Sequence, residues 1–127
     1  MSNFFIKQGE DTPEILIDFD AGLVEIAGKS LPEDSTSFYI PVENAVKEYI
    51  SNPKPKTTIN LRLEYLNSSS QKRILEILTL LEELIVKGFE VQVNWFYNPE
   101  DEDILEEGKD LAKMLKLPLN IISKQVK

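Results

Sequence analysis

The sequence predicts an α/β fold: an open mixed β-sheet of about five strands, with helices mainly on one face. Several short segments alternate apolar and polar residues, as half-buried strands do, and longer segments between them repeat apolar residues at helical spacing. Their order is β-β-α-β-α-β-α-β, and strands separated by helices are expected to lie parallel. Because the strands alternate instead of being apolar throughout, we expect one sheet face to stay largely uncovered.

The chain opens with a predicted pair of strands. Alternating apolar residues predict one strand over residues 14–20 and a second over 23–27. Ala21-Gly22 between them suits a hairpin turn. Residues 28–35 are rich in turn-forming residue types and predict a loop connection.

A helix is expected next. Its apolar stripe consists of Val42, Val46, Tyr49 and Ile50. Pro41 is expected in the first turn, because a proline in the interior would kink the helix. The helix should end near Ser51-Asn52, since Pro53 and Pro55 cannot continue it.

The second half of the chain contains the remaining predicted elements. In order they are a strand over 57–65, the longest helix from a serine segment to about residue 87, a strand over 89–97, a helix beginning at Asn98-Pro99, and a strand over 119–123, with a loose tail over 124–127. Trp95 and Tyr97 share a strand face that we expect to be buried. Phe96 lies on the opposite, open face and is a candidate for partner contact.

Length and charge limit the class of protein. At 127 residues we expect one domain over 1–127. The net charge of −8 argues against a nucleic-acid partner and against an anionic membrane surface. No apolar run approaches the roughly 20 residues that cross a bilayer, and the first residues lack the pattern of a secretory signal. A cytoplasmic location is therefore expected.

The chain has no cysteine and no histidine. Disulfides, thiolate or imidazole metal sites, cysteine nucleophiles and Ser-His-Asp arrangements are therefore excluded. Acid–base chemistry would fall to carboxylates, lysine or tyrosine, so a small enzyme using Glu64 with Tyr65 is the enzymatic alternative. The acidic run Glu100-Asp101-Glu102-Asp103 fits a helix start better than a cation site, because consecutive helical residues diverge around the axis. We expect no cofactor and no metal ion.

The segment Tyr65-Leu66-Asn67-Ser68-Ser69-Ser70 lies where a predicted strand ends and the longest helix begins. Backbone N–H groups at a helix start lack partners within the helix, and the helix dipole there favours negative charge. Either Asn67 or Ser68 would cap the helix, Ser68 in a capping box with Gln71. A phosphate on a serine at this junction would meet favourable donors, so the junction is a candidate covalent switch.

Several stretches carry a resemblance to a known family. In order they are Thr12-Pro13-Glu14, Gly28-Lys29-Ser30-Leu31-Pro32-Glu33-Asp34-Ser35, Phe38-Tyr39-x-Pro41-Val42, Leu63-Glu64-Tyr65-Leu66-Asn67-Ser68-Ser69-Ser70 and Val93-x-Trp95-x-Tyr97-x-x-Glu100-Asp101-Glu102. Together they resemble the SiaC family of bacterial regulatory phosphoproteins. The resemblance runs through nearly the whole chain, and the Tyr-Leu-Asn-Ser-Ser-Ser segment is its most specific part.

The resemblance implies a fold similar to the STAS domain of anti-sigma-factor antagonists. It also implies that a dedicated kinase phosphorylates one hydroxyl at the strand–helix junction and that a PP2C-type phosphatase removes the phosphate. The unphosphorylated form would bind and activate a diguanylate cyclase, which makes cyclic di-GMP and promotes biofilm growth. The modified residue of the family directly follows the asparagine, which selects Ser68 here, whereas alignment on the Asp-Ser-Ser motif of the antagonists selects Ser69.

We therefore predict a non-enzymatic phosphoprotein, modified on Ser68 with Ser69 as second candidate, that binds a protein partner when unmodified. The predicted partner contacts are Tyr65, Asn67, Ser69, Ser70, Lys72, Arg73 and Phe96. Leu31 and Ala45 stand where the family often has tyrosine and tryptophan, which leaves the identity of the partner open. An anti-sigma-factor antagonist in a partner-switching pathway and a purely structural subunit are the other non-enzymatic interpretations.

Overall fold

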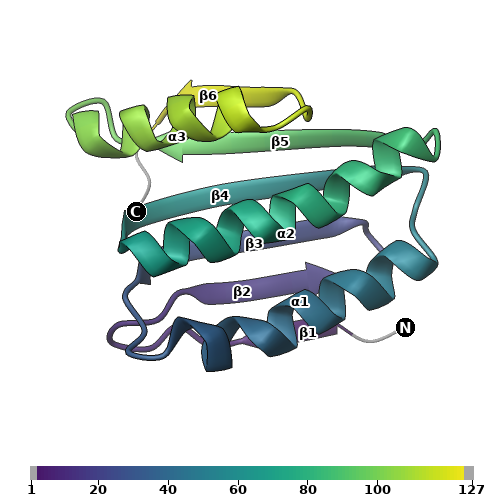
Figure 1. Cartoon of the computed structure of the whole chain (residues 1–127), viewed down its shortest axis with the longest axis horizontal. Coiled ribbons are helices and arrows are strands. Elements are labelled where there is room, and N and C mark those ends of the chain that lie inside the picture. The colour runs from purple at the N-terminus through teal and green to yellow at the C-terminus, as the bar shows by residue number, and fades with distance from the viewer. Residues whose placement is uncertain (1–2, 125–127) are drawn as a thin grey trace.

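The computed structural model describes residues 3–124, which form one six-stranded sheet with helices packed on it (Figure 1). The elements are β1 Asn3–Ile6, β2 Glu14–Asp18, β3 Leu23–Ser30, α1 Ser35–Ser51, β4 Lys56–Leu66, α2 Ser68–Val86, β5 Glu90–Tyr97, α3 Glu102–Met114 and β6 Leu119–Ser123. All three of these helices lie on the same face of the sheet (Figure 1), as the alternating strands predict. Within the described range, none of the helices has the length and apolarity needed to cross a membrane.

The strands follow one another across the sheet in chain order, from β1 to β6. β1, β2 and β3 pair antiparallel, whereas β3, β4, β5 and β6 pair parallel. The predicted α/β class with a mixed sheet is therefore confirmed. Since β4 and β5 point the same way, the loops that start α2 and α3 lie at the same edge of the sheet (Figure 1).

The core lies between the sheet and the helices. Its largest fully buried side chains include Trp95, Tyr39 and Tyr49. Trp95 also donates a hydrogen bond from Nε1 to the carbonyl of Ile104 at 2.9 Å, which fixes α3 against β5. A Cβ at Gly108 would lie 2.5 Å from Cδ1 of Trp95, so α3 can pack this closely over the indole only because residue 108 is glycine.

Polar side chains gather in the middle of the sheet face opposite the helices. A row of side-chain hydrogen bonds crosses it from β3 to β6: Asn60 donates to Glu25 at 3.0 Å, Asn94 to Asn60 at 2.9 Å, and Asn120 to Asn94 at 3.1 Å. Because these side chains hydrogen-bond with one another, their partly buried polar atoms are satisfied. The prediction that one face carries no helix is confirmed for the described residues.

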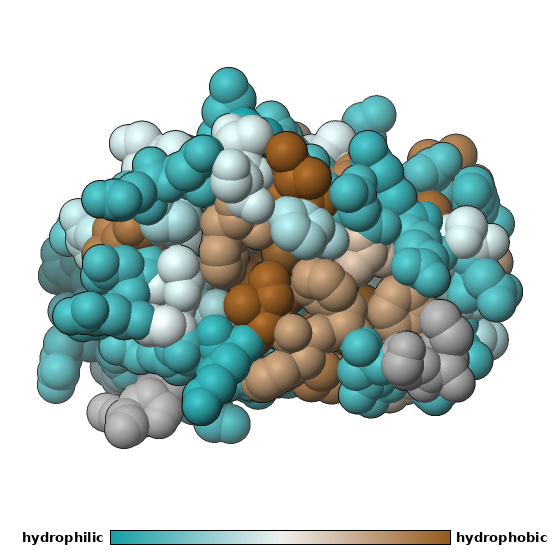
Figure 2. Space-filling view, turned by 90° about the horizontal axis from the view of Figure 1, so that it is seen from below, coloured by the Kyte–Doolittle hydropathy of each residue, from teal (hydrophilic) through white to brown (hydrophobic). Residues whose placement is uncertain are grey.

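β1 is the element that the sequence does not predict. Its residues Asn-Phe-Phe-Ile lack the alternation of a half-buried strand, but Phe4 and Ile6 pack against the core when β1 pairs with β2. The sheet therefore has six strands instead of about five. Seen from the edge where α1 and β1 lie, apolar side chains gather in the middle of the surface (Figure 2), and Phe5 and Ile40 are among the exposed large apolar residues.

The structure differs from the predicted loop over 28–35, and it describes only the first residue of the predicted tail over 124–127. Residues 28–30 continue β3 instead of forming a loop, because Gly28 adopts φ +109° and the pairing with β4 shifts register after it. That irregularity lets the strand extend as far as Ser30. Of the predicted loose tail, residues 125–127 lie outside the described range, while Lys124 donates its backbone N–H to Tyr97 at 2.9 Å.

Two helices begin at other residues than predicted. α1 begins six residues before Pro41, because Asp34 caps it by accepting hydrogen bonds from the backbone N–H and the hydroxyl of Ser37 at 3.1 and 2.8 Å. Pro41 therefore lies inside the helix and not in its first turn. α3 begins after Asp101, whose carboxylate accepts from the N–H of Ile104 at 3.0 Å, so Asn98-Pro99 belong to the preceding turn.

Candidate functional site

The candidate site is the junction between β4 and α2. Asn67 caps α2: its Oδ1 accepts from the backbone N–H of Ser70 at 2.9 Å and from the hydroxyl of Ser69 at 3.1 Å. Of the two predicted caps, Asn67 is therefore correct. The capping box of Ser68 with Gln71 does not form, because Gln71 Nε2 donates to a carboxylate oxygen of Glu107 on α3.

A buried chain of hydroxyl groups holds this junction in place. The hydroxyl of Tyr39 on α1 lies 2.6 Å from Ser30 Oγ, and Ser30 Oγ donates to Ser70 Oγ at 2.7 Å. Ser70 Oγ in turn donates to the carbonyl of Ser30 at 2.9 Å, and that carbonyl also accepts from the backbone N–H of Asn67 at 3.1 Å. Burial raises the pKa of Tyr39 to about 12, so its hydroxyl keeps its proton for this contact. The network ties α1, β3 and α2 together at the junction.

The three serines of the junction have different environments. Ser70 is 0% exposed and its hydroxyl is bound to Ser30, so it does not lie on the surface that the predicted partner contact would need. Ser68 and Ser69 are both exposed. The hydroxyl of Ser69 is engaged with Asn67, whereas that of Ser68 has no hydrogen-bond partner among residues 3–124. Ser68 therefore has the more accessible hydroxyl.

Ser68 opens into a groove between α2 and α3 with a volume of about 730 Å³. From the junction the lining includes Tyr65, Asn67, Gln71 and Lys72, so these predicted residues do lie together. The α3 side of the groove contributes Asp103, Glu106, Glu107, Asp110, Leu111 and Met114. Over residues 3–124 no group of three or more acidic residues is arranged to hold a metal ion. The acidic character of this groove is not evident from the sequence, because the pairing of α3 with α2 is a long-range contact.

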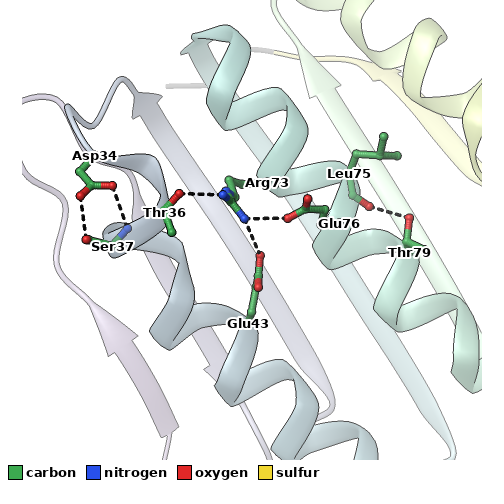
Figure 3. Close-up of polar contacts among 8 residues, drawn as sticks. All are labelled: Asp34, Thr36, Ser37, Glu43, Arg73, Leu75, Glu76 and Thr79. Carbon is green, nitrogen blue, oxygen red and sulfur yellow. Dashed lines mark hydrogen bonds and ion pairs between the residues drawn. The ribbon is translucent and has the colours of Figure 1, made fainter.

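Arg73 lies on the other side of α2, toward α1 (Figure 3). Its guanidinium donates to Thr36 Oγ1 at 2.7 Å and to Glu76 at 2.9 Å, and it lies 3.8 Å from Glu43. On the helix, Arg73 is four residues after Ser69, whereas Lys72 is four residues after Ser68. Arg73 therefore takes part in the contact between α1 and α2 and does not line the groove that holds Ser68.

Glu43 is the least favourably placed charge of this cluster. Its Oε2 is buried and has no hydrogen-bond partner within the described part of the chain. Burial raises the pKa of Glu43, the negative charge of Glu76 raises it further, and the charge of Arg73 only partly opposes this. Because the folded protein favours protonated Glu43, this group contributes stability below its unfolded pKa and loses it as the pH rises through its raised folded pKa.

We therefore predict that Glu43→Gln raises the free energy of unfolding at pH 7 and has little effect near pH 3.5. Denaturant unfolding at both pH values measures the difference. Glu33→Gln, at an exposed glutamate, is the matched control and should give no gain at pH 7. A loss of stability at pH 7 in Glu43→Gln would mean that the ion pair with Arg73 outweighs the burial of the charge.

Two further predicted residues are not part of the groove. Phe96 lies on the polar sheet face, but only 8% of it is exposed, because Arg62 lies over its ring at 4.7 Å and Lys124 approaches at 5.8 Å. The expectation that Phe96 presents an open apolar surface is therefore wrong. Glu64 is exposed and does not line the groove that Tyr65 lines, so the structure does not join these two residues in a common pocket.

Comparisons with known proteins agree with this architecture. Residues 6–124 match the model of the SiaC family regulatory phosphoproteins. An uncharacterised protein of Pseudomonas aeruginosa (strain UCBPP-PA14) is 32% identical over 121 residues, which cover 95% of this chain and 96% of that protein.

Solved structures of SiaC from Pseudomonas aeruginosa are also similar. Apo-SiaC superposes with a TM-score of 0.88 at 31% identity, covering 97% of this chain and 100% of that one. A structure of the diguanylate cyclase SiaD in complex with its activator SiaC gives a TM-score of 0.89 at 30% identity, with 95% and 99% covered. Because the family model matches residues 6–124, this chain belongs to the SiaC family of regulatory phosphoproteins.

Proposed function

We propose that this chain is a non-enzymatic switch protein that binds an effector protein while Ser68 is unmodified and releases it when Ser68 is phosphorylated. The observation that carries the proposal is the exposed hydroxyl of Ser68 at the start of α2, which has no hydrogen-bond partner within residues 3–124 and opens into a groove large enough to receive a partner. A related SiaC is found in complex with the diguanylate cyclase that it activates. A diguanylate cyclase is accordingly the effector that we propose here, which would make the chain part of cyclic di-GMP signalling.

The local geometry favours Ser68 over Ser69 as the modified residue. Ser69 already uses its hydroxyl to support the Asn67 cap, so its modification would disturb the helix start. Ser68 is exposed, and Lys72 one turn along the helix also lines the groove. Lys72 makes no ion pair with a residue in the described range, so its ammonium group is available to a phosphate on Ser68.

A phosphate at Ser68 would be poorly accommodated beneath a bound partner. It adds about −1.5 to −2 charges to a groove whose opposite wall already carries Asp103, Glu106, Glu107 and Asp110. Because Lys72 is the one cation among the described residues that line the groove, the phosphate would keep much of its hydration shell. A partner that covers Ser68 would have to remove that water and find room for the phosphoryl group, which disfavours the complex.

The same proposal assigns the other components of the switch. A protein kinase would use ATP to phosphorylate Ser68, and a PP2C-type phosphatase would hydrolyse the phosphate ester, so the chain itself needs neither cofactor nor metal. Since both enzymes would act in the cytoplasm, we propose that the chain is cytoplasmic as well. An antagonist of an anti-sigma factor would use the same chemistry with a different partner, and the complex of a related SiaC with a cyclase favours the cyclase over this alternative.

We predict that the protein isolated from its own cells carries a phosphoryl group, about 80 Da, on Ser68 in part of the population. Intact-mass measurement followed by peptide sequencing locates the group. Ser68→Ala should abolish the added mass, whereas Ser69→Ala should retain it. Phosphate on Ser69 alone, or none under any growth condition, would contradict the assignment.

A further inference from the structure

The groove beside Ser68 combines two kinds of surface. Tyr65 and Met114, two of its lining residues, are 56% and 61% exposed, and Leu75 is partly buried along the same groove. Large apolar side chains exposed together around one concave surface are typical of interaction sites. An occupant of this groove would bury Tyr65 from β4 and Met114 from the end of α3 at the same time.

Charge decides which occupant fits. Asp103, Glu106, Glu107 and Asp110 follow one another at helical spacing, so they share one side of α3 and line one wall of the groove. Lys72 on α2 is the one cationic lining residue within 3–124, and outside the lining Lys109 lies 3.6 Å from Glu106. Burial raises the pKa of Glu107, and the neighbouring charges of Asp110 and Asp103 raise it further, against the hydrogen bond from Gln71. The negative charge of this wall is thus incompletely compensated within the groove.

We propose that this groove binds a basic amphipathic segment of the effector protein, with lysine or arginine side chains against the α3 carboxylates and separate apolar side chains against Tyr65 and against Met114. The proposal rests on the proposed function, because it makes the groove next to Ser68 the effector site. Opposite charge attracts such a segment and apolar contact holds it. Acidic and neutral segments would lack this electrostatic attraction.

This assignment has a consequence for the mechanism of the switch. A phosphate on Ser68 would attract lysine and arginine, so its negative charge alone cannot expel a basic segment. The phosphoryl group would instead act through its volume and its hydration shell at the position where the segment has to pack. The carboxylates of α3 would determine how tightly the segment binds, and the modification state of Ser68 would determine whether there is room for it.

The test uses the full unphosphorylated chain and a synthetic helical peptide of about 14 residues containing leucine and lysine at amphipathic spacing. Isothermal calorimetry measures its affinity, and methyl NMR signals of Met114, Leu75 and Leu111 report where it lies. The double variant Glu106→Gln/Asp110→Asn should weaken binding about fivefold or more. The matched double variant Glu10→Gln/Glu33→Gln, at exposed acidic residues outside the groove, changes the net charge equally and should weaken binding less than about twofold.

Two results would overturn the groove assignment: equal loss of affinity in both double variants, or equal binding of a peptide with glutamate in place of lysine. Failure of the assignment is distinguishable from failure of the switch, because the peptide assay involves no phosphorylation. If phosphate controls activation of a cyclase but the peptide does not bind in the groove, the groove assignment is wrong and the proposed switch at Ser68 still stands. Peptide binding in the groove without any effect of phosphate on the cyclase supports the inference and removes the switch.

Discussion

Phosphorylation of Ser68 is expected to weaken the binding of the effector cyclase by about 100-fold or more, which corresponds to about 2.7 kcal/mol. The unmodified hydroxyl is exposed at the groove and has no partner within residues 3–124, so a bound protein can cover it at little cost. The phosphoryl group adds volume and tightly held water beside four carboxylates. The measurement compares homogeneously phosphorylated and unphosphorylated protein, by calorimetry for affinity and by the rate of cyclic di-GMP formation from GTP for activation.

The controls separate the volume of the group from its charge. Ser68→Ala should bind and activate as the unmodified protein does, and treatment with kinase should not change it. Ser68→Gln adds volume without charge, and Ser68→Glu adds a similar volume with a negative charge. Equal weakening of binding by both variants would support a steric mechanism. If the phosphorylated and unmodified proteins bind with equal affinity, Ser68 does not control the effector.

Much of the fold and the position of the site can be predicted from local patterns. Alternating apolar residues predict β2 to β6, and apolar residues at helical spacing predict the three helices. The strand–helix junction, with Asn67 as one of two possible caps, follows from the residue types between two such patterns. These features depend on neighbours in sequence, which is why they are predictable. The comparison with STAS domains stays a prediction.

The wrong predictions about the site concern contacts between residues far apart in sequence. Ser70 is buried because Ser30, 40 residues earlier, accepts and donates hydrogen bonds with it, and no local pattern signals this pairing. Phe96 is covered because Arg62 on the neighbouring strand lies over its ring. The acidic groove exists because α3 lies beside the start of α2, which depends on the order of strands in the sheet. A local signal does exist for the start of α1, where Asp34 precedes Ser37 as a capping residue.

Tyr39→Phe is expected to lower the free energy of unfolding by about 2 kcal/mol and to loosen the phosphorylation site. It removes the hydroxyl that supports Ser30 Oγ, and Ser30 holds both Ser70 and the backbone of Asn67. Denaturant unfolding measures the stability. Amide hydrogen exchange over residues 67–71 measures the order of the junction, and we expect exchange there to accelerate about tenfold.

Tyr49→Phe is the matched control, because the chain repeats the same interaction elsewhere on α1. Tyr49 is also buried, and its hydroxyl lies 2.6 Å from Thr57 Oγ1, in β4 just after its start, far along the strand from the serine junction. The Tyr49 hydroxyl also accepts from the backbone N–H of Lys54 at 3.2 Å, so Tyr49→Phe should lose at least as much stability as Tyr39→Phe. Only Tyr39→Phe should change exchange over residues 67–71 and the rate at which a kinase modifies Ser68. Equal effects of the two variants on the junction would mean that Tyr39 stabilises the fold in general and does not position the site. A selective effect would show that the position of the Ser68 hydroxyl depends on the hydrogen bonds by which Tyr39 and Ser30 hold the buried Ser70.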